Sequence, residues 1–283
     1  MKLNLNYQQA KKSIARITYL FIGCVFILGI LHFFFREVYL ADDYRFFNLD
    51  EEETLATWFS GVLFFLFGCT GYITYLVERS INANKGKKVF NLPILWIGVC
   101  LIGFFLSLDE ITSLHEHLFL AEYITLEEIF ELSEDVLDFW ALMFSPAIAL
   151  MLGFFITFFV NRYTSSKIAL WLAYSGIAVW VVALLIEGLR EAFYDVSYSL
   201  YSISVLFEES LESIGTILLL SSVLSYLGEI GLDLTPERIK RLEIGSNILN
   251  KRTIISLGVL VATFILFSWV VVQFGDGVFF FVG

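Results

Sequence analysis

The chain has 283 residues, of which 58% are hydrophobic and only 17% are charged, and its formal net charge is −11. So few charged residues cannot cover the surface of a water-soluble domain of this size, and 30 phenylalanines add to the apolar excess. The composition therefore excludes an ordinary soluble globular protein and predicts an all-α integral membrane protein.

Seven segments are apolar for long enough to cross about 30 Å of hydrocarbon as helices, which takes roughly 20 residues each. In chain order they are residues 17–36, 55–77, 92–114, 136–160, 168–189, 205–227 and 254–274. The first segment follows basic residues, as in a signal peptide, but it is too long and no small-residue cleavage site follows it. We expect it to remain as a membrane span. No linker or soluble domain interrupts the chain, which predicts a single transmembrane domain over residues 1–283.

The basic residues indicate how these spans are oriented. Nearly all Lys and Arg residues fall in segments that alternate spans would place on one side of the membrane: 1–16, 78–91, 161–167 and 228–252. Only Arg36, Arg45 and Arg190 lie elsewhere. By the positive-inside rule these segments are cytoplasmic, so the N-terminus is cytoplasmic and the C-terminus lies outside. Most carboxylates then lie at the outer face, and we expect the inner membrane of a bacterium with this acidic face outward.

Several familiar chemistries lack their motifs. There is no GxGxxG after a strand, no Walker lysine loop, no HExxH and no GxSxG. Cys24, Cys69 and Cys100 all lie within predicted spans without CxxC spacing, which argues against a disulfide framework or a thiolate metal site. The basic loops are explained by topology, so nucleic-acid binding is not indicated.

Many acidic residues fall at the predicted outer starts of spans. They are Asp50 to Glu53 at the second span, Glu134, Asp135 and Asp138 at the fourth, and Glu208, Glu209 and Glu212 at the sixth. A helix N-terminus favours negative charge by about 0.3–1 kcal/mol, so the helix dipole would explain these positions.

The third and fifth spans run in the opposite direction, so their acidic residues fall at helix C-termini, where the dipole disfavours anions. These residues are Asp109, Glu110, Glu116, Glu187 and Glu191. The stretch SLDEITSLHEHL at 107–118 adds two histidines, His115 and His117. This placement has no explanation of the same kind and indicates a functional site.

Helical spacing brings many of these groups onto shared faces. At 100° per residue, Asp109, Glu110, Glu116 and His117 share one arc of the third span, whereas His115 points elsewhere. Glu208, Glu209 and Glu212 share an arc of the sixth span, and Glu187 and Glu191 are four residues apart. We therefore expect three helices to direct carboxylates into one outward-facing cavity, where protons, a metal or a cationic ligand would offset their charge.

One hypothesis is a metal-dependent hydrolase that acts on a lipid-type ester or amide presented from the outer leaflet. Its metal ligands would be Glu110, His117, Glu208 and Glu212, and Asp109 or Glu116 would be the general base. Further candidates for the site are His115, Glu187, Glu191 and Glu209. Such ligands suit a divalent Zn, Mn or Fe ion, and oxygen ligands alone suit Ca.

A second hypothesis is a cation- or proton-coupled transporter or channel that uses the same acidic site. The serine and threonine ladder FEESLESIGTILLLSSVLSYL of the sixth span supports it, although such residues also hydrogen-bond packed membrane helices. A third is a non-catalytic membrane subunit or sensor whose acidic face docks a basic partner. The alternative to all three functions is that the carboxylates are solvated residues at the membrane interface with no special role. His32, alone in the first span, is expected to be a packed, hydrogen-bonded histidine.

Two resemblances fit these residues. TWFSG at 57–61, SLDEITSLHE at 107–116 and EESLE at 208–212 resemble a pattern of uncharacterised polytopic membrane proteins of bacteria, which implies the same architecture and no particular activity. Ser107, Asp109 and His115 are also similar to the early part of the motif of the CREST family of seven-span zinc hydrolases. That family holds zinc with a late HxxxH pair, which is missing here because no histidine follows His117.

Overall fold

The computed structural model describes residues 7–35, 45–49, 54–85, 92–112, 139–189, 193 and 196–232, and every regular element within them is a helix. In chain order these elements are α1 (Tyr7–Phe33), the short 3-10 helix η2 (Arg45–Phe47), α2 (Leu55–Lys85), α3 (Leu95–Thr112), α5 (Phe139–Arg162), α6 (Lys167–Glu187) and α8 (Tyr198–Leu232). Five of them, α1, α2, α3, α6 and α8, are long and apolar enough to cross a membrane. The predicted all-helical membrane class is confirmed; the predicted span 254–274 lies outside the described residues.

Three helices are longer than the apolar segments predicted for them. α1 begins at Tyr7 instead of residue 17, α2 continues to Lys85 instead of 77, and α8 covers Tyr198–Leu232 instead of 205–227. Hydropathy marks only the apolar part of a helix, whereas backbone hydrogen bonding continues through polar residues that are solvated or paired. The polar residues in these extensions belong to helices and not to connecting loops.

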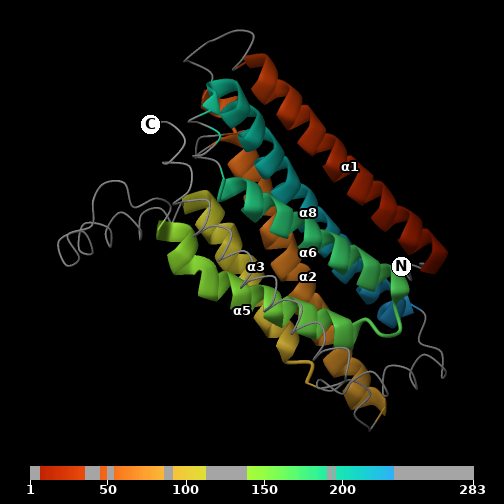
Figure 1. Cartoon of the computed structure of the whole chain (residues 1–283). Coiled ribbons are helices and arrows are strands. Elements are labelled where there is room, and N and C mark those ends of the chain that lie inside the picture. Colours follow the sequence, from red (N-terminus) through yellow and green to blue (C-terminus); the bar gives the residue numbers. More distant parts are fainter. Residues whose placement is uncertain are drawn as a thin grey trace.

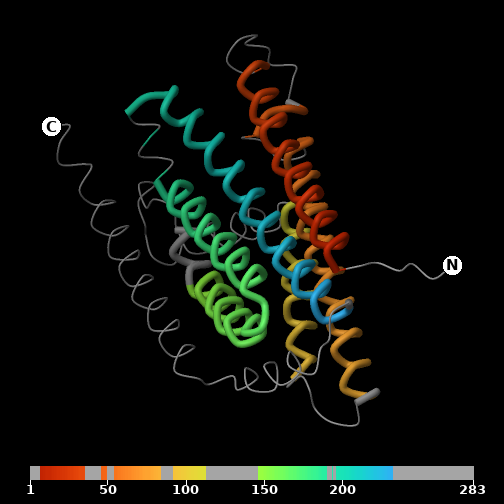
Figure 2. The backbone as a smooth tube through the Cα atoms, turned by 90° about the vertical axis from the view of Figure 1, so that its right-hand side faces the viewer, coloured from red at the N-terminus to blue at the C-terminus, as the bar shows by residue number. Residues whose placement is uncertain are grey.

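The long helices form a bundle in which consecutive helices run in opposite directions, and α8 lies at its centre in contact with α1, α2 and α6 (Figures 1 and 2). The start of α1 therefore meets the end of α8, where the Tyr7 hydroxyl donates to Glu229 at 3.0 Å. We call this the Glu78 end, after a buried residue of α2. The opposite end, where α3 and α6 finish, is called the carboxylate end.

Two pairs of helices approach each other closely at glycines. A Cβ atom added to Gly103 of α3 would lie 2.7 Å from the backbone nitrogen of Gly68 in α2. A Cβ on Gly176 of α6 would lie 2.9 Å from the carbonyl oxygen of Gly215 in α8. Small residues allow membrane helices to pack with their backbones in contact, so α2·α3 and α6·α8 are tightly joined units.

An aromatic core fills the space between these units. The rings of Phe67 and Phe155 lie 5.8 Å apart, and Phe64 of α2 lies 5.6 Å from Trp180 of α6. The Trp180 indole N–H also donates to the carbonyl of Glu212 at 3.0 Å. A buried tryptophan with a satisfied N–H explains why this residue occurs in the middle of a helix able to span a membrane. This apolar layer separates the two ends of the bundle.

Candidate functional site: a carboxylate cluster

Five glutamates gather at the carboxylate end of the bundle. Glu209 of α8 is the common member, because the charges of four other carboxylates act on it: Glu110, Glu212, Glu208 and Glu187. α3 contributes one of these residues, α6 one and α8 three. The structure thus brings together acidic residues from three helices that are far apart in the sequence.

The Glu110 side chain is positioned by contacts between α3 and α2. It lies two residues before the end of α3 and accepts a hydrogen bond from the hydroxyl of Ser60, a buried residue of α2. One turn earlier, the Ser107 hydroxyl donates to the carbonyl of Gly61 at 2.8 Å. These two bonds hold the end of α3 against α2 and orient Glu110.

The three glutamates of α8 do not lie at a helix N-terminus, which corrects the expectation from the sequence. α8 begins at Tyr198, so Glu208 lies about three turns inside the helix. The favourable effect of the dipole on anions falls off within the first turn. Glu208 is also only 5% exposed, so neither the dipole nor solvent at the surface explains its position.

The other predicted site residues divide into two groups. Asp109 is half-buried beside Glu110 on α3, and Glu187 is the last residue of α6. The remaining four lie outside the described residues: His115, Glu116, His117 and Glu191. His32 behaves as expected, because it is buried and its Nδ1 accepts a hydrogen bond from the Leu49 N–H at 3.0 Å.

The described carboxylates do not have the spacing of a metal site. Within that part of the chain, no group of three or more His, Cys, Asp or Glu side chains is arranged to hold a metal ion. Glu110, Glu208 and Glu212 thus form no such site by themselves, and the fourth predicted ligand, His117, lies outside that part. Cys24, Cys69 and Cys100 are free thiols.

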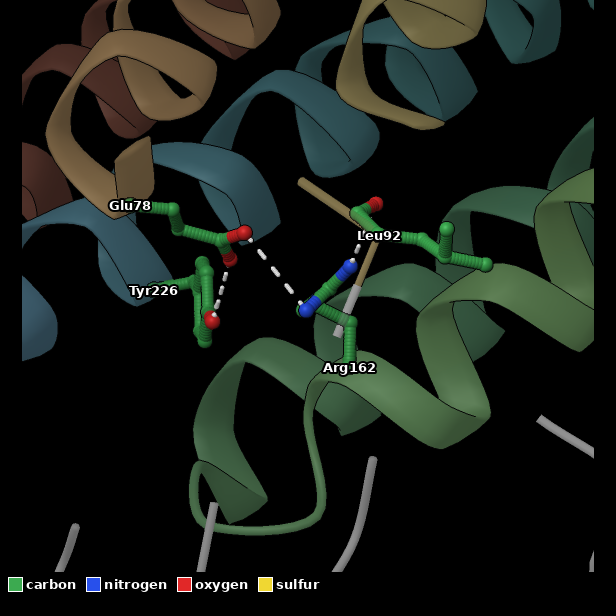
Figure 3. Close-up of polar contacts among 4 residues, drawn as sticks. All are labelled: Glu78, Leu92, Arg162 and Tyr226. Atoms are coloured by element: carbon green, nitrogen blue, oxygen red, sulfur yellow. Dashed lines mark hydrogen bonds and ion pairs between the residues drawn. The ribbon is translucent and has the colours of Figure 1, made fainter. Parts of the chain in front are cut away.

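A second polar cluster lies at the opposite end of the bundle (Figure 3). Glu78 of α2 is fully buried, accepts a hydrogen bond from the Tyr226 hydroxyl at 2.7 Å, and lies 3.5 Å from an Arg162 guanidinium nitrogen. The same guanidinium donates to the carbonyl of Leu92 at 3.2 Å. This cluster joins α2, α5, α8 and the turn at Leu92 that leads into α3.

Hydropathy did not predict this cluster, because Glu78, Arg162 and Glu229 fall outside the apolar segments and were expected in connecting loops. The expectation of loops is wrong, because all three residues belong to helices and are at most 7% exposed. Glu229 accepts hydrogen bonds from Tyr7 and, at 2.8 Å, from Ser166, the N-cap of α6.

Helical periodicity contained a signal for Glu78. Thr70, Thr74 and Glu78 are spaced four residues apart, so they share one face of α2, and all three are buried. A face that carries polar residues beyond the apolar segment indicates that the helix continues and that this face is buried against other helices. The partner Arg162 lies far away in the sequence, so no local pattern could identify it.

These features define a polytopic helical membrane protein with a polar cluster at each end of an aromatic core. A family model, the domain of unknown function DUF8692, matches residues 17–227, and the chain belongs to this family. The match includes the five glutamates of the carboxylate end and the Glu78, Arg162 and Tyr226 contacts. A comparison with curated proteins gave no match, and neither did one with solved structures.

Proposed function

We propose that the chain is a cation- or proton-coupled membrane transporter whose carboxylate cluster binds the transported ion. The observation that carries this proposal is the approach of four other glutamate charges to Glu209 in a helix that is able to cross a membrane. Placing an ionisable side chain inside a membrane costs free energy, and such residues mark ion or proton pathways. Protons or a bound cation would offset the repulsion among these like charges.

Hydroxyl groups along α8 support transport. Four buried residues follow the cluster toward the Glu78 end: Ser213, Thr216, Ser221 and Ser222. Hydroxyl oxygens replace part of the hydration shell of an ion, as polar pore linings do. The spread of the carboxylates over three helices also suits a cation or proton better than the tight ligand geometry of a catalytic metal.

For the topology, we propose seven spans with a cytoplasmic N-terminus and an outer C-terminus. Basic residues such as Lys11, Arg79 and Lys167 belong to helix parts at the Glu78 end, so the positive-inside rule makes this end cytoplasmic. The carboxylate cluster then faces outward from the inner membrane of a bacterium, with lipids around the exposed apolar faces of the helices.

Ion flux into liposomes tests the transport proposal. Purified protein is reconstituted, a proton or cation gradient is applied, and internal pH or cation content is followed. Glu209→Gln should lower the flux by about tenfold or more, a change of about 1.4 kcal/mol in the barrier. Arg79→Gln is the control, because Arg79 is an exposed residue at the other end that has no part in binding the ion, so its flux should equal that of the wild type. Equal flux in wild type and Glu209→Gln would contradict the proposal.

A metal-dependent hydrolase is the second candidate, favoured by the two histidines that follow Glu110 along the chain, His115 and His117. In this case purified protein should contain a stoichiometric divalent metal, such as Zn, Mn, Fe or Ca. We expect the metal to be lost from both Glu208→Ala and His117→Ala. Metal analysis decides this, and wild-type protein that takes up none of these ions would exclude the hydrolase. If both tests fail, a subunit or sensor that docks a basic partner remains.

A further inference from the structure

We propose that the contacts around Glu78 form a gate, which holds this end of the bundle closed and opens when α2 and α3 move away from α5 and α8. The proposal rests on the transport function proposed above, because an ion taken up at the carboxylate end must leave at the other end. It adds a moving part and its location to that function.

All gate contacts cross the same boundary within the bundle. Glu78 belongs to α2 and Leu92 to the turn that leads into α3, whereas Arg162 belongs to α5 and Tyr226 to α8 (Figure 3). Glycine crossings join α2 to α3 on one side and α6 to α8 on the other, and a hydrogen-bonded turn connects α5 directly to α6. A relative movement of the two sides would therefore break the gate contacts together and leave each side intact.

The chemistry of the contact suits a gate better than a permanent joint. Buried ion pairs carry a large desolvation cost, and well-packed apolar residues hold helices together equally well or better. Glu78 and Arg162, by contrast, are well solvated when they separate and water enters. The gate opens against an apolar cost as well, because Trp96 of α3 must part from Phe158 and Tyr226, whose rings lie 4.8 and 5.7 Å away across the same boundary.

Backbone strain is found at the same place. Among the described residues, Leu92 is the non-glycine residue with a positive φ, 47°, and it directly precedes Pro93. Both features restrict the backbone, and such strain persists only where surrounding contacts enforce it, often in switch regions. The Leu92 carbonyl is held by Arg162, so separation of the gate would allow this turn to relax.

The carboxylate cluster spans the same boundary as the gate. Glu110 lies on the α3 side, and Glu209 lies on the α8 side within reach of its charge. A cation or proton bound between them would reduce the repulsion between the two sides at one end. Binding at the cluster can thus shift the balance between closed and open gate, provided that the ion binds the two states with different affinity.

Chemical labelling of a buried position tests the gate without any transport measurement. Cys24, Cys69 and Cys100 are replaced by alanine, and Ser222→Cys places a reporter thiol at a fully buried site 3.5 Å from the Tyr163 hydroxyl. The protein is placed in lipid nanodiscs, which leave both faces accessible, and reacted with a small cationic methanethiosulfonate. A closed gate gives slow labelling.

We expect Glu78→Gln and Arg162→Gln to raise the labelling rate by about tenfold or more, because each shifts the population toward the open state. Arg79→Gln is the matched control, since Arg79 is an exposed neighbour of Glu78 and should leave the rate unchanged. Folding of each variant is checked by its melting temperature. Labelling rates equal to the control in both gate variants would overturn the gate.

A triple variant, Glu78→Leu with Arg162→Met and Tyr226→Phe, separates a gate from a structural joint. It replaces the polar contact by an apolar one that cannot open to water. We therefore expect a folded protein whose labelling rate is no faster than that of the parent. Its ion flux should be lowered by about tenfold or more. Wild-type flux in this variant would overturn the gate. If the wild-type protein itself shows no flux, the transport proposal fails, while the labelling rates still decide for or against the gate.

Discussion

Replacing Arg162 by methionine should destabilise the folded protein by about 3–5 kcal/mol, the cost of leaving a buried charge without its counter-ion. Glu78 is fully buried and lies 3.5 Å from the Arg162 guanidinium, so its charge cannot be transferred to solvent while the bundle stays closed. Methionine fills a similar apolar volume, which limits the loss to electrostatics. Denaturant unfolding in detergent measures the change.

The matched control for this variant is Arg79→Met. Arg79 is exposed and donates to the Tyr75 hydroxyl at 3.3 Å, an interaction that solvent weakens. Its removal should change the unfolding free energy by no more than about 0.5 kcal/mol. If Arg162→Met proves as stable as this control, Glu78 and Arg162 are not a buried pair in the folded protein.

Gly215→Ala should destabilise the protein by about 1–3 kcal/mol, the usual cost of overpacking a tight interface. The added Cβ would clash with Cδ1 of Trp180 and lie 3.1 Å from the carbonyl oxygen of Gly176. The Trp180 ring cannot easily turn away, because its N–H is held by the Glu212 carbonyl and, at 3.1 Å, by the Thr216 hydroxyl. α6 and α8 must therefore separate, which a lower melting temperature would report.

Gly228→Ala provides the control on the same helix. Its nearest neighbour for an added Cβ is Ile14 Cδ1 at 3.8 Å, an ordinary contact. Alanine is a better helix former than glycine by about 0.5–1 kcal/mol, so this variant should be neutral or slightly more stable. Equal melting temperatures for the two variants would mean that α6 and α8 do not approach as closely as this crossing implies.

The membrane class and the approximate position of the described helices could be predicted from hydropathy alone. α3 (Leu95–Thr112) and α6 (Lys167–Glu187) match their predicted segments to within a few residues. Such segments are read directly from the apolar residues, because a helix in lipid satisfies its own backbone hydrogen bonds. The ends of α2 and α8 could not be predicted in this way, since polar residues continue both helices.

Sequence spacing also predicted that carboxylates of the third, fifth and sixth spans point toward one region. In the described residues, Glu110 and Glu187 lie near enough to Glu209 for both of their charges to act on it. The explanation expected for the acidic residues of α8 was wrong. Because α8 begins at Tyr198, Glu208 is too far from the helix N-terminus for the helix dipole to stabilise its charge. Where a helix begins depends on how its polar first turns are accommodated, which hydropathy does not measure.

The amino-acid sequence by itself determined the helical membrane class, the apolar segments and the faces on which acidic residues lie. Only the tertiary structure decided that Glu78 pairs with Arg162 and that Trp180 packs against Gly215. The physical reason is that periodicity acts within one helix, over a few turns, whereas burial and ion pairing depend on which helices become neighbours. A glutamate beyond an apolar run has the same sequence pattern whether it is solvated or buried beside an arginine on another helix.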